Sequence, residues 1–282
     1  MLSERQKEFL SWKFGLFFHF GIRTFYPGRR DWDRIPMEAD RFCPEEFDPG
    51  QWMEVARKAG ARYTVLTTKH HDGFALWQSE YSRFGVRESS WRNGKGDVVR
   101  EYTEAARKAG IKVGLYYSLA EWNGSEFPFS DEENYDRYVI GQLTELLSDY
   151  GKIDYLWFDG NGTEGHHFNI PAIKEKIYAL QPDILLFADP EWEPSVFWIG
   201  NETGYAGAGS HPEPAECDCM VRDTWFYDDN EETVKSVGKL RDMYENSVGR
   251  GCNMLLNIGP DRRGLLPEPD VLRVLGITRD GV

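Results

Sequence analysis

The sequence lacks the features that mark membrane proteins, nucleic-acid-binding proteins and repeat proteins. No apolar run reaches the roughly 20 residues of a membrane-spanning helix, and the chain has no internal repeat and no low-complexity tract. Positive charge is in deficit, because 33 Lys and Arg stand against 47 Asp and Glu and leave a net charge of −14. We therefore expect neither nucleic acid nor a membrane as a partner.

Cysteine is scarce as well. Cys43, Cys217, Cys219 and Cys252 have the spacing of neither a disulfide framework nor a zinc site, so we expect all four to be reduced and structural. The first residues are polar and resemble the start of a helix rather than a signal peptide. As it stands the chain is expected to be cytoplasmic, or periplasmic or secreted if a signal peptide was removed.

Hydrophobic and aromatic residues, in contrast, are plentiful. They make up 40% and 15% of the 282 residues, which is enough apolar material for a sizeable core. A barrel domain of roughly 250 residues would use nearly the whole chain, so we predict one catalytic domain over residues 1–282. Ten Trp and fourteen Tyr also offer flat rings of the kind that pack against the C–H faces of sugars.

Eight candidate strands alternate with helical segments. The strands are expected at Phe14–Phe20, Tyr63–Lys69, Lys112–Ser118, Ile153–Asp159, Ile184–Ala188, Val196–Asn201, Met220–Phe226 and Asn253–Ile258. The helices are expected at Gln51–Lys58, Val98–Lys108, Glu132–Tyr150, Ile170–Leu180 and Glu231–Val248. Such alternation predicts an α/β fold with a parallel sheet. The connections after the fifth and sixth strands form no convincing helix, so we predict an irregular (β/α)8 TIM-like barrel.

The fourth candidate strand ends in a carboxylate, Asp159, followed by Gly160. Catalytic residues of parallel β/α barrels lie at the C-terminal ends of the strands, so Asp159 is a candidate catalytic group. An alternative is that Asp159 only starts a turn, because Gly160-Asn161-Gly162 follows it.

Polar and aromatic residues end most of the other strands too, which packing alone does not explain. They are Phe17, His19, His70, His71, Tyr116, Tyr117, Trp157, Glu202 and Trp225. Asp159 and Glu202 form a pair of carboxylates on different strand ends, and retaining glycosidases need two carboxyl groups about 5 Å apart. Competing acids near Glu202 are Glu191, Glu193, Glu213 and Glu216.

The histidines admit a second interpretation, a metal site with His19, His70, His71 and Asp72 as ligands. Adjacent strand residues point to opposite faces, so His70 and His71 would ligate one ion only if the strand had already turned into a loop. Neutral imidazoles can equally bind sugar hydroxyls. We predict no metal and no cofactor.

Several stretches together resemble the α-L-fucosidases of glycoside hydrolase family 29. The general family motifs are Phe14-Gly15-Leu16-Phe17-Phe18-His19-Phe20-Gly21, Lys69-His70-His71-Asp72-Gly73-Phe74-Ala75-Leu76-Trp77 and Leu156-Trp157-Phe158-Asp159-Gly160. Motifs similar to the 1,3/1,4-linkage subfamily are Gly200-Asn201-Glu202, Pro214-Ala215-Glu216-Cys217-Asp218, Trp225-Phe226-Tyr227, Ser247-Val248-Gly249-Arg250 and Asn253-Met254-Leu255-Leu256-Asn257-Ile258-Gly259-Pro260. The match runs in order over nearly the whole chain.

The resemblance implies a retaining α-L-fucosidase that removes terminal α-1,3/1,4-linked fucose from oligosaccharides or glycoconjugates. Asp159 matches the nucleophile and Glu202 the acid/base. The positions that hold fucose are matched by His19, His70, His71, Tyr116 or Tyr117, Trp157 and the pair Asp31-Trp32, to which we add Phe17 and Trp225 as expected substrate contacts.

The chain departs from the family in two respects. Asp31 stands where the family's Glu-Trp pair has Glu, which shortens a sugar contact, and the second departure is larger. Family members usually carry a C-terminal β-sandwich after the barrel, whereas this chain stops at Val282, soon after the eighth candidate strand. We therefore expect the barrel without the sandwich, through truncation or as a natural form. The alternative functions are a catalytically inactive fucose-binding barrel and a metal-dependent hydrolase.

Overall fold

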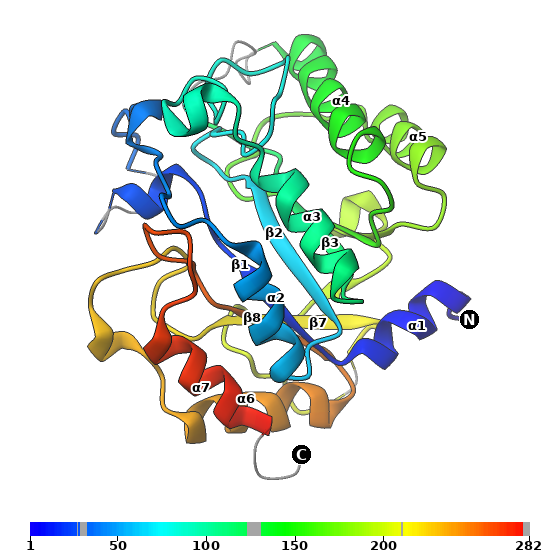
Figure 1. Cartoon of the computed structure of the whole chain (residues 1–282). Coiled ribbons are helices and arrows are strands. Elements are labelled where there is room, and N and C mark those ends of the chain that lie inside the picture. The colour runs from blue at the N-terminus through cyan, green and yellow to red at the C-terminus, as the bar shows by residue number, and fades with distance from the viewer. Residues whose placement is uncertain (27, 29–32, 123–130, 210, 279–282) are drawn as a thin grey trace.

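Eight parallel strands form one sheet in the order β5-β4-β3-β2-β1-β8-β7-β6 in the computed structural model (Figure 1). The structure describes residues 1–26, 28, 33–122, 131–209 and 211–278. The strands are Phe14–Phe18 (β1), Tyr63–Lys69 (β2), Lys112–Ser118 (β3), Tyr155–Asp159 (β4), Leu185–Phe187 (β5), Phe197–Trp198 (β6), Ala215–Met220 (β7) and Asn253–Asn257 (β8). A bridge between Phe187 and Val196 nearly closes the sheet. The predicted irregular (β/α)8 barrel is confirmed.

The α-helices of the described residues pack around this sheet. They are Glu4–Trp12 (α1), Pro49–Lys58 (α2), Val98–Lys108 (α3), Glu132–Ser148 (α4), Ile170–Leu180 (α5), Val237–Ser247 (α6) and Glu268–Thr278 (α7). The side chain of Asp97 caps the start of α3 by accepting from Arg100 N, and Gly110 follows its end with a φ of +71°. No helix in these described ranges is long and apolar enough to cross a membrane.

The expected absence of α-helices after the fifth and sixth strands is seen in the described residues. A 3-10 helix, Pro190–Trp192, stands between β5 and β6. The connection from β6 to β7 contains no helix in its described residues, 199–209 and 211–214. The cavity described below therefore has loops rather than packed helices on this side.

Two predicted elements were wrong in position. The seventh strand is Ala215–Met220 rather than Met220–Phe226, because Glu216 and Asp218 face the interior of the barrel and the sequence therefore does not look like a strand. Helix α6 begins at Val237 rather than Glu231, because Glu231–Thr233 forms a separate 3-10 turn and Ser236 caps the helix.

The interior of the barrel is filled by aromatic rings. Helix α1 closes one end, where the ring of Phe9 lies 5.8 Å from that of Tyr63 and 5.3 Å from that of Tyr155. Gly15 in β1 makes room for Tyr63, because a Cβ at this position would lie 2.6 Å from the Tyr63 ring. With this end packed, the C-terminal ends of the strands are left to form the cavity.

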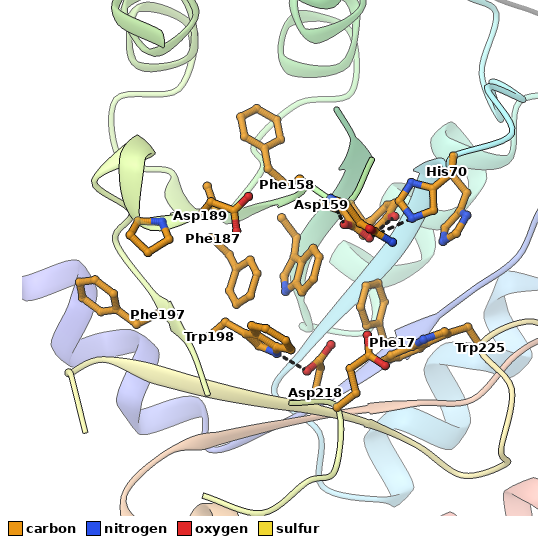
Figure 2. A pocket seen from close by; sticks show the side chains of 18 of the residues that line it. Phe17, His70, Phe158, Asp159, Phe187, Asp189, Phe197, Trp198, Asp218 and Trp225 are labelled. Atoms are coloured by element: carbon orange, nitrogen blue, oxygen red, sulfur yellow. Dashed lines mark hydrogen bonds and ion pairs between the residues drawn. The ribbon is translucent and has the colours of Figure 1, made fainter. Parts of the chain in front are cut away.

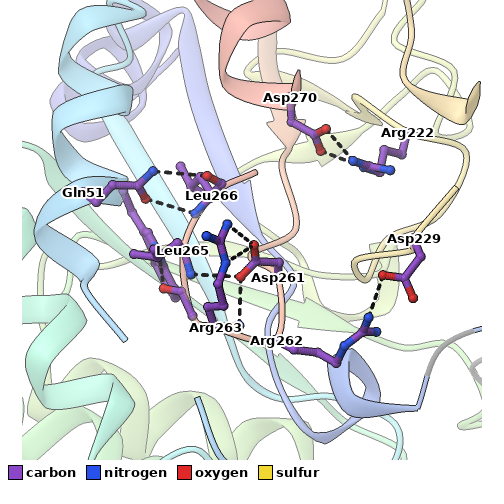
Figure 3. Close-up of polar contacts among 11 residues, drawn as sticks. Gln51, Arg222, Asp229, Asp261, Arg262, Arg263, Leu265, Leu266 and Asp270 are labelled. Atoms are coloured by element: carbon purple, nitrogen blue, oxygen red, sulfur yellow. Dashed lines mark hydrogen bonds and ion pairs between the residues drawn. The ribbon is translucent and has the colours of Figure 1, made fainter. Parts of the chain in front are cut away.

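Polar contacts anchor the segment that follows β8 (Figure 3). The guanidinium of Arg222 donates two hydrogen bonds of 2.8 Å to the carboxylate of Asp270, in the first turn of α7, and both side chains are buried. Gln51 of α2 exchanges two hydrogen bonds with the backbone of Leu266. Helices at opposite ends of the sequence are thus fixed to the same side of the barrel.

Candidate active site

A cavity of about 700 Å³ opens at the C-terminal ends of the strands (Figure 2). Nearly every predicted site residue within the described ranges lines it. These residues are Phe17, His19, His70, His71, Tyr116, Trp157, Asp159, Glu202 and Trp225. The predicted contacts Asp31 and Trp32 lie outside the described residues.

Asp159 is the last residue of β4, and its carboxylate is held on both oxygens. The hydroxyl of Tyr116 donates to Oδ2 at 2.8 Å, and Nε2 of His71 lies 3.4 Å from the same oxygen. The backbone N–H of Asn161 donates to Oδ1 at 2.9 Å, so Asp159 does start a turn, as the alternative interpretation proposed. The side chain nevertheless keeps 22% of its surface exposed, so the turn fixes an accessible carboxylate in place.

Tyr117, the other tyrosine considered for sugar contact, lies on the opposite face of β3 from Tyr116. Its hydroxyl donates to Oε1 of Gln142 in α4, at 2.7 Å, and its ring is fully buried in the outer core. Neighbouring strand residues face opposite sides of a sheet, which places Tyr116 in the cavity and Tyr117 behind it. This corrects the expectation for Tyr117.

The protonation of His71 follows from its partner. Nδ1 of His71 lies 2.6 Å from the hydroxyl oxygen of Ser118, and that hydroxyl donates its hydrogen to the carbonyl of Ala120. Ser118 can therefore only accept from Nδ1, which must carry a proton. Nε2 is left to face Asp159.

The protonation of His19 is fixed in a similar way. Its Nδ1 lies 2.8 Å from Oδ1 of Asn257, whose amide nitrogen donates to the carbonyl of Trp225. Burial lowers the pKa of His19 to about 3, against the opposing effect of the Asn257 hydrogen bond. A neutral His19 with its proton on Nδ1 leaves Nε2 as an acceptor.

His70 is also buried, and burial together with the neighbouring His71 lowers its pKa well below the usual value. Its ring stacks on Tyr116 with an interplanar angle of 9°. Nδ1 of His70 has no hydrogen-bond partner among the described residues. A buried polar nitrogen without a partner is uncommon in folded proteins.

Both histidines can face the cavity because β2 ends at Lys69, before either of them. Ligand atoms of His70, His71 and Asp159 lie within 4.8 Å of one another, a spacing compatible with a metal ion. The group differs from the predicted metal set. Asp72 instead accepts a hydrogen bond from Phe74 N, and His19 is not part of the group.

Trp157 is stacked between two other rings and fixed from below. Its ring lies 4.0 Å from that of Phe187 and 5.4 Å from that of Tyr116. Its Nε1 donates to Oε1 of Glu216 at 3.0 Å. Glu216 was a competitor for the acid/base role, but it is fully buried beneath the cavity and does not line it. Burial raises the pKa of Glu216 to about 7.

Glu202 lines the cavity from the turn beyond β6, where its φ is +61°. In the described part of the chain, its other competitors, Glu191, Glu193 and Glu213, do not line the cavity. A nearby carboxylate, Asp218 of β7, lines it as well. Burial, and to a lesser extent the charge of Glu202, raise the pKa of Asp218 to about 7, while a hydrogen bond from Trp198 opposes the shift.

Sequence reasoning missed other residues that line the cavity, among them Phe187, Asp189, Trp198 and Asp218. Asp189 had a visible signal, because it follows the fifth strand just as Asp159 ends the fourth. Its pKa is raised by partial burial and by the neighbouring Asp159. Asp218 had none, since the seventh strand was misplaced.

A barrel of parallel strands with several carboxylates in one cavity at the strand ends is the arrangement expected of a glycoside hydrolase. A family model described as Alpha-L-fucosidase matches residues 26–279. The chain belongs to the α-L-fucosidase family, glycoside hydrolase family 29.

Individual relatives agree with this. Alpha-L-fucosidase 1 of Arabidopsis thaliana is 36% identical, over 93% of this chain and 57% of its own length. Tissue alpha-L-fucosidase of Mus musculus is 29% identical, over 90% of this chain and 64% of its own length. The structure of a glycoside hydrolase 29 family member from a rumen bacterium superposes with a TM-score of 0.88 at 30% identity, covering 99% of this chain and 56% of that one. The chain thus spans about half to two thirds of the length of the curated relatives it matches.

Proposed function

We propose that this chain is a retaining α-L-fucosidase that acts by double displacement, with Asp159 as nucleophile and Glu202 as acid/base. The observation that carries the proposal is the position of Asp159. Its carboxylate stands at the end of a barrel strand, is oriented by Tyr116 and Asn161, and remains open to the cavity. A nucleophile needs this combination of fixed orientation and access.

The side of the cavity formed by β1 to β4 suits a small sugar. Neutral His19 offers Nε2 as an acceptor for a hydroxyl group, and His70 lines the cavity beside it, with ring centroids 5.5 Å apart. The rings of Phe17, Trp157 and Trp225 supply apolar surface beside these polar atoms. Polar atoms and flat rings together are what recognition of a 6-deoxy sugar, with its methyl group, requires.

In the first step, a carboxylate oxygen of Asp159 attacks the anomeric carbon while Glu202 gives a proton to the departing glycosidic oxygen. In the second step, Glu202 takes a proton from water, and that water displaces Asp159 from the sugar. The configuration at the anomeric carbon is inverted twice and so retained.

For the linkage, we propose α-1,3 or α-1,4 bonds to a branched glycan. The support is the sequence Gly200-Asn201-Glu202, which resembles the 1,3/1,4 subfamily and which carries a carboxylate that lines the cavity. The proposed substrate is therefore a fucosylated oligosaccharide.

The test is release of fucose from a branched fucosylated trisaccharide and from an aryl fucoside, by wild type and by Asp159→Ala. We expect turnover by wild type only. Azide should partly restore the variant and give a fucosyl azide of inverted configuration, because a small anion can take the place of the lost carboxylate. Activity of the variant within about tenfold of wild type, a change of only ~1.4 kcal/mol in the barrier, would rule out Asp159 as nucleophile.

A further inference from the structure

Trp198 is an exposed aromatic residue at the cavity wall. It lies on β6, 45% of it is exposed, and it is the only one of the exposed large hydrophobic residues in the described ranges that lines the cavity. Leaving a Trp ring in water forfeits the stabilisation that its burial would give. Packing within this chain therefore does not explain its position.

The ring is fixed in place despite its exposure. Nε1 of Trp198 donates a hydrogen bond of 2.7 Å to Oδ1 of Asp218, a carboxylate that is only 3% exposed (Figure 2). The backbone on both sides of Trp198 is also held, by Phe197 N donating to O of Pro214, just before β7, at 2.9 Å and by Ile199 N donating to O of Glu216 in β7 at 3.0 Å. The side chain therefore presents a flat apolar face of fixed orientation, and little conformational freedom is left to lose on binding.

Its location is on the leaving-group side of the reaction. The groups available to fucose lie at the ends of β1 to β4, together with Trp225, which follows β7 and lies 4.7 Å from the His19 ring. Trp198 is instead the last residue of β6, four residues before Glu202. The acid must reach the glycosidic oxygen, so the sugar attached to that oxygen departs on the side of Glu202. A pyranose there would come against Trp198.

We propose that Trp198 is the stacking platform for the sugar on the leaving side of the scissile bond, and that Asp218 is the positioning residue that fixes its ring. The proposal rests on the proposed function and adds the part of the substrate it recognises. The ligand class is a pyranose that offers a C–H face to the indole. Trp198 thus makes the enzyme prefer oligosaccharides to simple fucosides.

The experiment compares two substrates that share fucose and differ in the leaving group. One is a branched fucosylated trisaccharide, and the other is α-L-fucosyl fluoride, whose fluoride cannot stack. Trp198→Ala should lower kcat/KM for the trisaccharide by roughly ten- to a hundredfold, mainly through KM. For the fluoride, kcat/KM should stay within about twofold of wild type, which also shows that the variant is folded. Inhibition by the defucosylated disaccharide should weaken in parallel with the trisaccharide KM.

Further variants distinguish the contribution of the Trp198 ring from that of its hydrogen bond to Asp218. Trp198→Phe keeps a flat ring and should retain more trisaccharide activity than Trp198→Ala. Asp218→Asn keeps an oxygen that accepts the indole N–H, so it should preserve the preference for the trisaccharide, whereas Asp218→Leu should reduce it. Tyr81→Ala is the matched control, because Tyr81 is an aromatic residue of similar exposure, 42%, away from the cavity.

The outcomes separate this inference from the proposed function. If Trp198→Ala lowers kcat/KM equally for both substrates, the role of Trp198 is structural. If it lowers kcat/KM for neither substrate, no sugar stacks on Trp198. Either result overturns the platform while the enzyme still hydrolyses fucosyl fluoride. If wild type does not hydrolyse the fluoride, the proposed function itself fails.

Discussion

Trp157 donates its indole hydrogen to the buried carboxylate of Glu216, at 3.0 Å, from inside the barrel. The hydroxyl of Tyr155 donates to the same carboxylate oxygen at 3.0 Å, and that of Tyr63 to the other oxygen at 2.6 Å. One carboxylate thus gathers three donors from two strands. It fixes an aromatic wall of the cavity although it does not touch the cavity itself.

This relationship predicts that Glu216 acts through Trp157. Glu216→Leu removes all three acceptor contacts, so the ring of Trp157 should lose its fixed position and kcat/KM for fucosides should fall about tenfold, or ~1.4 kcal/mol, mainly through KM. Glu216→Gln can keep its oxygen toward Trp157 and Tyr155, and should retain most of the activity. Steady-state kinetics on an aryl fucoside measure both.

The control for Glu216 is Tyr117→Phe, which also removes a buried hydrogen bond but on the outer side of β3. It should lower the free energy of unfolding by ~1 kcal/mol and leave kcat/KM unchanged. Equal kinetics for Glu216→Leu and wild type would show that Trp157 needs no anchor.

The parts of the fold that the sequence predicted are those with a local pattern. Strands β2 and β3 and helices α3 and α5 have the predicted bounds, because each shows clear periodicity and is bounded by capping or turn residues. Asp159 could be found for the same reason, as a charge at the end of an apolar strand.

Strand β7 could not be predicted in this way. Its inward residues, Glu216 and Asp218, are carboxylates, and they are tolerated inside the barrel because Trp157 and Trp198, with two tyrosines, donate to them from distant parts of the chain. Such compensation depends on tertiary contacts and leaves no local signal. The same applies to the choice between Tyr116 and Tyr117, which rests on which face of β3 points inward.

If Glu202 is the acid/base, the loss of activity in Glu202→Ala should depend on the leaving group of the substrate. A sugar leaves as a basic alkoxide and needs a proton, whereas dinitrophenolate barely does, so Glu202→Ala should lose roughly 10²–10⁴-fold on a branched oligosaccharide. The rate of glycosyl-enzyme formation from a dinitrophenyl fucoside should fall far less, which burst kinetics would measure. Azide should speed turnover of the variant and give a fucosyl azide of retained configuration, which product analysis would identify. An equal loss on both substrates would place the acid/base elsewhere, and Asp218, which lines the cavity and whose pKa is affected by the charge of Glu202, would be tested next.

Chelation distinguishes the two possible uses of the histidines. His70, His71 and Asp159 lie close enough to hold an ion, yet Oδ2 of Asp159 already accepts a hydrogen bond from Tyr116. Because two carboxyl groups suffice for a retaining glycosidase, we expect dialysis against EDTA to leave kcat unchanged. Lost activity that returns with zinc or manganese would instead favour a metal-dependent hydrolase.

Asp218 predicts a specific pH dependence of stability. Its pKa is about 7 in the folded protein, raised mainly by burial, and about 3.9 in an unfolded chain. Between these values the folded state keeps a proton that the unfolded state has lost, so the contribution of Asp218 to the free energy of unfolding falls as pH rises, by up to ~1.4 kcal/mol per unit. Glu216, with a pKa of about 7, acts in the same direction. His19, with a pKa of about 3, acts in the opposite direction between about pH 3 and its unfolded value.

Because these contributions oppose one another between about pH 4.5 and 6.5, the wild-type curve alone would hide that of Asp218. The informative quantity is the difference between Asp218→Asn and wild type, measured by urea unfolding at several pH values from 4.5 to 8. Asn cannot ionise, so the variant should gain stability relative to wild type as pH rises and level off above about pH 7. Tyr117→Phe serves as the control with a constant difference, since burial raises the pKa of Tyr117 well above this range. A difference for Asp218→Asn that is also constant would mean that Asp218 ionises in the folded protein as it does in the unfolded one.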